Sequence, residues 1–477
     1  MDTITALPEL ERLTLQRLLE RQRRAFTADP MPSLAQRREA LLRLKRALIA
    51  QRHALATAVD QDFGGRAAQE TLFADIMPVV QGIDHTLAHL RRWMRPSRRR
   101  VGINLWPGKA EVRYQPLGVV GIIVPWNYPI QLALAPLVGA LAAGNRVMLK
   151  LSELVPATNA VLRDLLGSAF AVEEVAVVEG GREVGEAFAR LPFDHLLFTG
   201  STAVGRQIMR AAAENLTPVT LELGGKSPAI IHESYPLEAA AQKICFGKTL
   251  NAGQTCVAPD YVLCPESRVE AFVAAFRSQY IRMYPRLLGN PDYTAIVSDG
   301  HRQRLRQLLE DAERKGARII TLDRPGEDLS GSRKMPVSLV LNTNDDMRVR
   351  QEEIFGPILP IIPYRGLDEA LAFVAARPRP LALYYFDHDR ERQDYVLDHS
   401  HAGGVSINDT LLHLAVDDMP FGGIGPSGMG HYHGWEGFQT FSKAKSVFRQ
   451  SRYSLIGMAY PPYKPWITRM MERWLLR

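Results

Sequence analysis

Val119-Val-Gly-Ile-Ile-Val124 is a short apolar run rich in β-branched residues, which is typical of a buried strand. Similar strand-like runs and helix-like stretches alternate around it: strands at 147–150, 175–178 and 195–198, and helices at 132–143, 157–170 and 182–189. Strands that alternate with helices in this way form a parallel sheet of βαβ units. The sequence therefore predicts an α/β fold with a parallel sheet in this part of the chain.

Polar residues stand where these strands end, and such sheets bind ligands at the carboxyl ends of their strands. The side-chain amide of Asn127 can hold a negatively charged oxygen, or it can complete a turn between Pro125 and Pro129. Lys150 closes the next strand, where its ammonium group can bind ribose hydroxyls or reach solvent. Residues 198–205 open a helix whose N–H groups suit a phosphate, although they lack the full GxGxxG pattern. We expect a cofactor site at this edge.

Cys256 and Glu222 supply a nucleophile and a base for one reaction. A thiolate can attack a carbonyl group, and a carboxylate can activate the water that releases the acyl group. Gly224 and Gly225 are expected to let the chain turn sharply beside Glu222. A lone intracellular cysteine is more often buried and inert, so the role of Cys256 depends on the rest of the chain.

A second α/β region follows Glu222 and carries Cys256. Its strand-like runs are at 229–231, 261–263 and 358–362, and its helix-like stretches are at 237–250 and 268–280. A site between this region and the first sheet is expected, because clefts between domains commonly hold the chemistry.

The residues before the first sheet have mainly helical spacing. Residues 7–59 predict amphipathic helix, interrupted at Asp29–Pro32, with Ser33 as the N-cap of the second part. A third helix is predicted over 70–93, and an alternating strand over 110–116.

Length and composition predict a cytoplasmic protein of two or more domains. A chain of 477 residues exceeds the size of a single core. Its three cysteines are too few for a disulfide framework, and no Cys or His spacing predicts a metal site; Cys245 and Cys264 fit core positions. The first residues carry acids and do not resemble a signal peptide, and no uncharged apolar run reaches transmembrane length.

The formal net charge is +7, with arginine clusters at 21–24 and 91–100. No nucleic-acid-binding motif accompanies this charge, so solvated helix faces that also attract anionic ligands are the favoured explanation, and no nucleic-acid partner is expected.

The chain resembles the aldehyde dehydrogenase superfamily from about residue 30 to residue 450. The resemblance rests on seven stretches in the same order and spacing: Pro125-Trp-Asn-Tyr-Pro129, Lys150-Leu-Ser-Glu153, Phe198-Thr-Gly-Ser201, Leu221-Glu-Leu-Gly-Gly-Lys-Ser-Pro228, Gly253-Gln-Thr-Cys256, Glu352-Glu-Ile-Phe-Gly-Pro357 and Pro420-Phe-Gly-Gly-Ile-Gly-Pro-Ser-Gly428. Leu151 departs from the pattern, because the family usually has proline there.

The resemblance implies a role for each matching residue. Cys256 would be the nucleophile and Glu222 the general base, while Asn127 and the Cys256 N–H would hold the oxyanion. The implied cofactor site, for NAD with NADP as the alternative, consists of Pro125, Trp126, Lys150, Ser152, Glu153, Gly200, Ser201, Glu353 and Phe355. The implied aldehyde pocket consists of Tyr128, Leu132 and Phe421.

Two shorter stretches place the chain within the superfamily. Residues 256–261 and 428–434 resemble the class 3 branch, and residues 431–442 are most similar to bacterial coniferyl aldehyde dehydrogenases. The implied activity is oxidation of an aromatic aldehyde to a carboxylic acid, with medium-chain or fatty aldehydes as the alternative. A CoA-acylating relative is disfavoured by Glu222, and a non-catalytic descendant by the intact set of site residues.

The resemblance also implies a Rossmann-like NAD-binding domain (1–99 and 117–222), a catalytic α/β domain (223–424) and small bridging strands used for oligomerisation (100–116 and 437–450). A homodimer is expected. The amphipathic tail at 451–477 is expected to pack on the partner subunit or on its own core, with contact to a membrane surface as the less favoured alternative.

Overall fold

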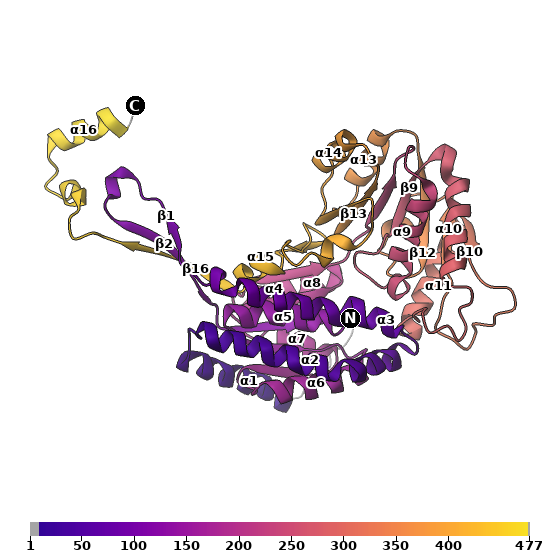
Figure 1. The fold of residues 1–477 in the computed structure, drawn as a ribbon, viewed down its shortest axis with the longest axis horizontal. Coiled ribbons are helices and arrows are strands. Elements are labelled where there is room, and N and C mark those ends of the chain that lie inside the picture. Colours follow the sequence, from indigo (N-terminus) through magenta and orange to yellow (C-terminus); the bar gives the residue numbers. More distant parts are fainter. Residues whose placement is uncertain (1–8, 476–477) are drawn as a thin grey trace.

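A computed structural model describes residues 9–475 of the protein (Figure 1). These residues form three sheets. Two are mainly parallel sheets covered by helices, and the third is a small antiparallel sheet that projects from the body. Residues 1–8 and 476–477, which begin the predicted first domain and end the predicted tail, lie outside the described residues.

The first sheet has six strands in the order β15-β7-β6-β3-β4-β5. They are β3 (Val119–Ile123), β4 (Arg146–Lys150), β5 (Val175–Val178), β6 (His195–Gly200), β7 (Val219–Leu223) and β15 (Gly428–Met429). All pair in parallel except β15, and the predicted strands are confirmed. The chain runs outward from β3 to β5 and returns to β6 on the other side of β3. Such a reversal opens a ligand crevice at the carboxyl ends of the strands beside it.

Successive residues of these strands enter different cores, because strand side chains alternate between faces. Val120 and Leu149 pack with α2, α4, α5 and α6, whereas Val119 and Met148 pack with α1, α7 and α8. The bounds are α1 (Glu9–Ala28), α2 (Leu34–Phe63), α4 (Met77–Trp93), α5 (Gln131–Ala143), α6 (Pro156–Ala169), α7 (Arg182–Ala189) and α8 (Thr202–Ala213). The sheet is thus buried on both faces, as a parallel sheet requires.

The second sheet has the order β10-β11-β12-β9-β8-β13-β14 and is parallel except at β10. Its strands are β8 (Pro228–Ile231), β9 (Tyr261–Pro265), β10 (Arg318–Thr321), β11 (Ser338–Leu341), β12 (Ile358–Tyr364), β13 (Ala382–Phe386) and β14 (Gly404–Ile407). Its helices are α9 (Leu237–Thr249), α10 (Val269–Met283), α11 (Asp299–Arg314), α12 (Arg348–Gln351), α13 (Leu367–Ala375) and α14 (Arg390–His399). Cys245 and Cys264 are buried in α9 and β9, which confirms their expected core positions.

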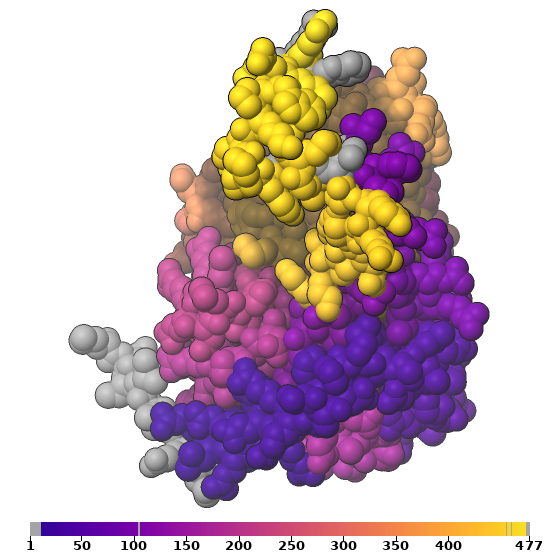
Figure 2. Space-filling model, turned by 90° about the vertical axis from the view of Figure 1, so that its left-hand side faces the viewer, coloured from indigo at the N-terminus to yellow at the C-terminus, as the bar shows by residue number. Residues whose placement is uncertain are grey.

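The third sheet consists of β1 (Ser97–Arg99), β2 (Lys109–Pro116) and β16 (Ser442–Arg449), all antiparallel. It projects from the body and carries α16 (Pro465–Leu475) near its tip, which Figure 2 shows in yellow. The boundary expected at residue 100 falls after β1, which pairs with β2. The helix α15 (Gly434–Thr440) packs on α4 and α5 and leads into β16.

The N-terminal helices follow the predicted pattern, with one difference. Ser33 caps α2 in a reciprocal capping box with Gln36. The helix predicted over 70–93 is divided into α3 (Ala68–Thr71), a π-helical turn η1 (Leu72–Ile76) and α4. A π-turn inserts one extra residue and re-aims the side chains after it, which helical spacing alone does not reveal.

Ser33→Ala should lower the free energy of unfolding by about 1 kcal/mol, because the N–H of Gln36 loses its side-chain acceptor at the start of α2. Urea unfolding followed by circular dichroism measures the change. Ser278→Ala, at an exposed position within α10, is the control and should not destabilise the protein. An equal loss in both variants would contradict a capping role for Ser33.

Candidate functional site

A cavity of about 580 Å³ lies between the two large sheets. It brings together ten of the residues predicted from the sequence: Pro125, Trp126, Asn127, Leu132, Gly200, Ser201, Glu222, Cys256, Glu353 and Phe355. The lining comes from both α/β regions, so the chemistry depends on how the two are held together.

Cys256 follows a tight left-handed turn in which Asn251, Ala252 and Gly253 all have positive φ (51°, 54° and 75°). A Cβ at Gly253 would come within 2.5 Å of the Gly356 carbonyl oxygen, so this position needs glycine. Burial, followed by the charges of two nearby carboxylates, raises the pKa of the Cys256 thiol to about 12. A thiol in this position stays protonated until a neighbouring group removes its proton.

Glu222 lies on β7 with 3% of its surface exposed. Neither carboxyl oxygen has a hydrogen-bond partner among the described residues. Burial raises the pKa of this carboxyl group well above its usual range, because a dry site disfavours the charged form. An unpartnered buried carboxyl group facing a cavity is suited to exchange protons with a bound molecule.

Asn127 lies in the turn after β3, and its side-chain amide reaches the loop that carries Cys256. Its Nδ2 donates to the Gln254 carbonyl at 3.1 Å. The main-chain carbonyl of Asn127 accepts hydrogen bonds from the Arg66 side chain (2.7 Å) and from the Asn251 side chain (3.0 Å). The main chain of Asn127 is therefore fixed, and its side-chain amide is tied to the loop that carries Cys256.

The opposite side of the cavity contains the start of α8. Ser201 caps this helix by accepting a hydrogen bond from the Val204 N–H. Thr202 and Ala203 line the cavity in the first turn, where helix N–H groups and the helix dipole favour a negatively charged group. This end of the cavity suits a phosphate, as the sequence predicted.

Three predicted residues lie at and just after the end of β4, outside the lining of this cavity. The ammonium group of Lys150 is buried and lies 3.4 Å from the half-exposed Glu153 carboxylate. Burial lowers the pKa of Lys150, although Glu153 acts against this effect. The Ser152 hydroxyl accepts from the Leu154 N–H and its carbonyl from the Asn159 side chain.

Glu353 explains one of two glycines for which the sequence suggested a different reason. A Cβ at Gly224 would collide with the Glu353 carboxylate, and the Gly225 N–H donates to that carboxylate. Neither glycine has positive φ or lies in a turn or bend, so the expected sharp turn is wrong. Close approach of the Glu353 carboxylate requires glycine at position 224, whereas a Cβ at Gly225 would come no nearer than 3.3 Å to another atom. Burial and the nearby Asp260 raise the pKa of Glu353 to about 7.

Aromatic side chains form one wall of the cavity. Phe355 adopts positive φ (51°), and its ring stands edge-on to Trp126 at 5.5 Å. Trp126 in turn meets the ring of His301 at 5.0 Å. A flat apolar group could rest against this wall.

Two residues of the predicted aldehyde pocket do not line this cavity. Tyr128 is buried, and its hydroxyl bonds to Thr255 at 2.7 Å, beneath the Arg66 guanidinium. Phe421 is buried against Tyr432, at 6.0 Å between ring centroids. Both therefore lie behind the lining.

The cavity also contains two residues that the sequence analysis missed, His301 and Arg304. Its other lining residues lie within or beside the stretches singled out in the sequence: Thr199, Thr202, Ala203, Leu223, Gly224 and Glu352. His301 and Arg304 lie one turn apart on α11, for which no motif gave a signal. Helical spacing could have shown that they share a face, but not which cavity that face meets.

Residues 9–475 contain neither a candidate metal site nor a helix that could span a membrane. No group of three or more His, Cys, Asp or Glu side chains in this range could hold a metal ion. No helix in the same range is long and apolar enough to cross a membrane.

The sequence and the fold both match known proteins. The model of the "Aldehyde dehydrogenase family" matches residues 1–447. The chain is 56% identical to a probable coniferyl aldehyde dehydrogenase of Pseudomonas aeruginosa, over 97% of this chain and 96% of that protein. It is 37% identical to aldehyde dehydrogenase family 3 member A2 of Rattus norvegicus, over 94% of this chain and 91% of that protein.

Among solved structures, a Mycobacterium tuberculosis aldehyde dehydrogenase complexed with NAD+ superposes with a TM-score of 0.84 at 30% identity, covering 93% of this chain and 92% of that chain. The expected superfamily, its class 3 branch and the fold class are confirmed. The chain belongs to the aldehyde dehydrogenase family and is an aldehyde dehydrogenase.

Proposed function

We propose that the protein oxidises an aromatic aldehyde of the coniferyl type to its carboxylic acid, with NAD as the electron acceptor. The observation that carries this proposal is that Cys256, Glu222 and Asn127 line one cavity. The same cavity is also lined by the first turn of α8. The substrate class is supported by the name of the 56% identical relative, and NAD by the NAD+ complex of a structural neighbour.

The proposed reaction begins when Cys256, as a thiolate, adds to the aldehyde carbon. The oxyanion that forms is held by the Asn127 amide and the Cys256 N–H, since such donors stabilise charge that develops during the reaction. Bound NAD would supply the acceptor for the hydride that leaves this carbon. A thioester on Cys256 remains.

Glu222 acts in the second half of the reaction. Its carboxylate takes a proton from water as the water attacks the thioester carbon. The carbon–sulfur bond then breaks, the acid leaves, and the thiol regains a proton. Water as the final acceptor distinguishes this reaction from CoA acylation, in which a thiol would be used instead.

The cofactor residues retain their sequence-derived roles in this proposal. Lys150 and Glu153 would hold the adenosine ribose, with Ser152 beside them. Gly200 and Ser201 would face the pyrophosphate at the start of α8. The other cofactor contacts would come from the nicotinamide end of the cavity: Pro125, Trp126, Glu353 and Phe355.

We further propose the domain assignment inferred from the sequence, with NAD on the first sheet, Cys256 on the second region and the small sheet used for assembly. A homodimer is favoured because the projecting sheet and tail expose large apolar side chains, including Trp106 (67%), Tyr463 (75%) and Trp466 (55%). The tail stands away from the two large sheets in Figure 1, so a partner subunit is the proposed surface for it. A cytoplasmic location suits a protein whose nucleophile must stay reduced.

Cys256→Ala should abolish turnover. Glu222→Gln should still carry out the first half-reaction, in which the thioester forms and the hydride is transferred. The variant keeps the size of Glu222 but cannot accept a proton, so thioester hydrolysis should slow by roughly 10²–10⁴-fold. Stopped-flow absorbance with coniferyl aldehyde and NAD should show a burst approaching one NADH per site, followed by a slow steady state. Mass spectrometry should find the acyl group on the peptide that contains Cys256.

The pH profile gives an independent check of Glu222. Since its pKa is raised, the carboxyl group is protonated at low pH and cannot act as a base. Hydrolysis in the wild type should therefore quicken as pH rises through that pKa, and this dependence should vanish in Glu222→Gln. Glu270→Gln, at an exposed ion pair with Arg318, is the control. Near-normal steady turnover in Glu222→Gln would remove Glu222 from the mechanism.

NAD should be used at least roughly tenfold more efficiently than NADP. The Glu153 carboxylate would repel a 2′-phosphate by about 1 kcal/mol in bulk water and about 4 kcal/mol near a protein surface, and 1.36 kcal/mol is a factor of ten. Glu153→Gln should lower the ratio of kcat/KM with NAD to kcat/KM with NADP. Glu238→Gln on α9 is the control and should leave this ratio unchanged. Equal efficiency with both cofactors in the wild type would contradict this assignment.

Removal of the residues after Tyr460 should weaken the dimer, because it deletes the apolar face of α16. Analytical ultracentrifugation across a concentration series measures the dissociation constant. Full-length protein should not co-sediment with anionic liposomes. Liposome binding that is lost on truncation, with an unchanged dimer, would show that the tail serves a membrane surface instead.

A further inference from the structure

The segment from Arg66 to Asp75 contacts both halves of the site through buried charged groups. Arg66 and Asp75 bond to the Asn127 turn and to the start of α5, which belong to the first α/β region. A third charged group, Glu70, reaches the second region. It lies on α3 with 6% of its surface exposed, where the two large regions meet (Figure 1). No sequence motif gave Glu70 a role.

The π-turn η1 helps one short segment to bury two carboxyl groups. Glu70 and Asp75 are five residues apart, and such residues lie about 140° apart around a regular α-helix, because one turn takes 3.6 residues. The π-turn begins between them and contains Asp75; its extra residue re-aims the side chains that follow. Both side chains are buried as a result. Burying two carboxyl groups so close together is costly, so the groups that they bond deserve a functional explanation.

One oxygen of Glu70 accepts two hydrogen bonds from the second region. The N–H of Asn251 donates to Oε2 at 3.1 Å, and the hydroxyl of Thr294 donates to the same oxygen at 2.7 Å. Asn251 begins the left-handed turn that leads to Cys256, and both donors belong to fully buried residues. Glu70 therefore satisfies a main-chain donor of the strained turn in a place that water does not reach.

Asn251 connects this anchor to the oxyanion side of the site. Its side-chain Nδ2 donates to the main-chain carbonyls of Asn127 (3.0 Å) and Gln254 (3.1 Å). The side-chain amide of Asn127 donates to the same Gln254 carbonyl at 3.1 Å. A displacement of Asn251 would therefore move the loop that carries Cys256 relative to the amide that is proposed to hold the oxyanion.

These contacts require an oxygen in the right place more than they require a charge. Burial raises the pKa of Glu70, whereas Arg66, Thr294 and the Asn251 N–H favour its charged form. Either form of the carboxyl group, and equally the amide of a glutamine, offers an oxygen acceptor. An aspartate would withdraw that oxygen by about one C–C bond, or ~1.5 Å. The reach of the side chain therefore decides whether both donors are satisfied.

We propose that Glu70 is a positioning residue for the reaction at Cys256: its carboxyl oxygen fixes the turn that presents the thiol and, through Asn251, the separation between the thiol and the Asn127 amide. This inference rests on the proposed function, in which the thiol adds to a carbonyl carbon whose oxygen Asn127 holds. A misplacement of about 1 Å can slow such a step by about a hundredfold. Binding of NAD should not depend on Glu70, because neither of its two hydrogen-bond donors is a proposed cofactor residue.

Three variants at position 70 separate reach from charge. Glu70→Gln keeps the oxygen within reach, Glu70→Asp keeps the charge but withdraws the oxygen, and Glu70→Ala removes both. The probe is 4-nitrophenyl acetate, an activated ester that acylates a thiol and releases 4-nitrophenolate without NAD. Its burst should slow about ten- to a hundredfold in Glu70→Ala and Glu70→Asp, and stay within about threefold of the wild-type rate in Glu70→Gln. The NADH burst with coniferyl aldehyde should follow the same order.

Two further measurements distinguish positioning from a general loss of structure. The Kd for NAD, measured by quenching of tryptophan fluorescence, should be the same in the wild type and in all three variants. Asp387→Ala is the matched control, because the buried Asp387 carboxylate also accepts from a main-chain N–H (Asp389, 3.0 Å) and from a hydroxyl (Tyr385, 2.8 Å) but does not line the cavity. This control should unfold at a lower temperature and keep both burst rates.

A wild-type burst rate in Glu70→Ala would overturn the inference. So would the reverse order, with Glu70→Asp fast and Glu70→Gln slow, or an affinity for NAD that falls in parallel with the burst rate. If Glu70→Ala does not fold, the comparison of Glu70→Gln with Glu70→Asp decides. The ester keeps these outcomes apart from the proposed function: if the wild type releases 4-nitrophenolate but oxidises no aldehyde, that function fails, and the order of the variants with the ester still decides the role of Glu70.

Discussion

The buried guanidinium of Arg66 holds together the parts on which the site depends. Its side chain is fully buried between the rings of Phe63 and Tyr128, at 5.0 and 4.8 Å. It donates to the Asn127 carbonyl at 2.7 Å and lies 3.5 Å from the Asp75 carboxylate. A buried charge of this kind is costly to leave unpaired, so the surrounding groups are fixed in one arrangement.

Asp75 of the Arg66–Asp75 ion pair also holds the start of α5 in place. The Asp75 carboxylate accepts from the N–H groups of Ile130 and Gln131, which have no cap from their own segment. Burial raises the pKa of Asp75 to about 6, while Arg66 and these N–H groups favour its charged form. Segments before the first sheet thus position the Asn127 turn and the helix that follows it.

Burial disfavours the charged forms of the acidic groups in the site, and this shapes the chemistry. Cys256, Glu222 and Glu353 share one buried region, and burial raises the pKa of each. The two carboxylates raise the pKa of the thiol further. Ionising any two of these groups together is therefore unfavourable. A mechanism that needs the thiolate first and the Glu222 carboxylate later fits this constraint.

The sequence predicted those features that depend on local pattern. The strands around Val119–Val124 and the cap at Ser33 follow from spacing and side-chain chemistry, and both are present. The motif positions also predicted which residues meet in the first cavity. Glycine was harder to interpret, because Gly224 is required by the distant Glu353 carboxylate and not by its own turn.

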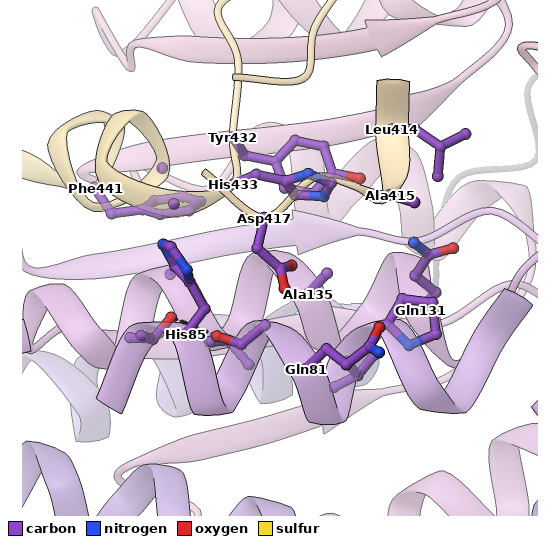
Figure 3. A pocket seen from close by; sticks show the side chains of 18 of the residues that line it. Gln81, His85, Gln131, Ala135, Leu414, Ala415, Asp417, Tyr432, His433 and Phe441 are labelled. Carbon is purple, nitrogen blue, oxygen red and sulfur yellow. Dashed lines mark hydrogen bonds between the residues drawn. The ribbon is translucent and has the colours of Figure 1, made fainter. Parts of the chain in front are cut away.

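Features that depend on long-range packing could not be predicted in this way. Whether Tyr128 lines a pocket or lies behind it depends on Thr255, 127 residues away in the sequence. Whether Phe421 does so depends on the chain folding back to bring Tyr432 against it. A second cavity, between α4, α5 and the segment that contains Tyr432 (Figure 3), was missed because it too depends on packing. The motif at 428–434 contains Tyr432 and His433, yet only the packing of α4 and α5 against them shows that they enclose a space.

The start of α5 borders two cavities. Leu132 lines the cavity of Cys256, and Gln131 lines a neighbouring cavity between α4, α5 and the segment 412–417. Asp75 fixes the backbone of this turn, whichever side chain Gln131 carries, because its hydrogen bonds are to main-chain N–H groups. A change of the side chain at position 131 would therefore leave the Asn127 turn in place.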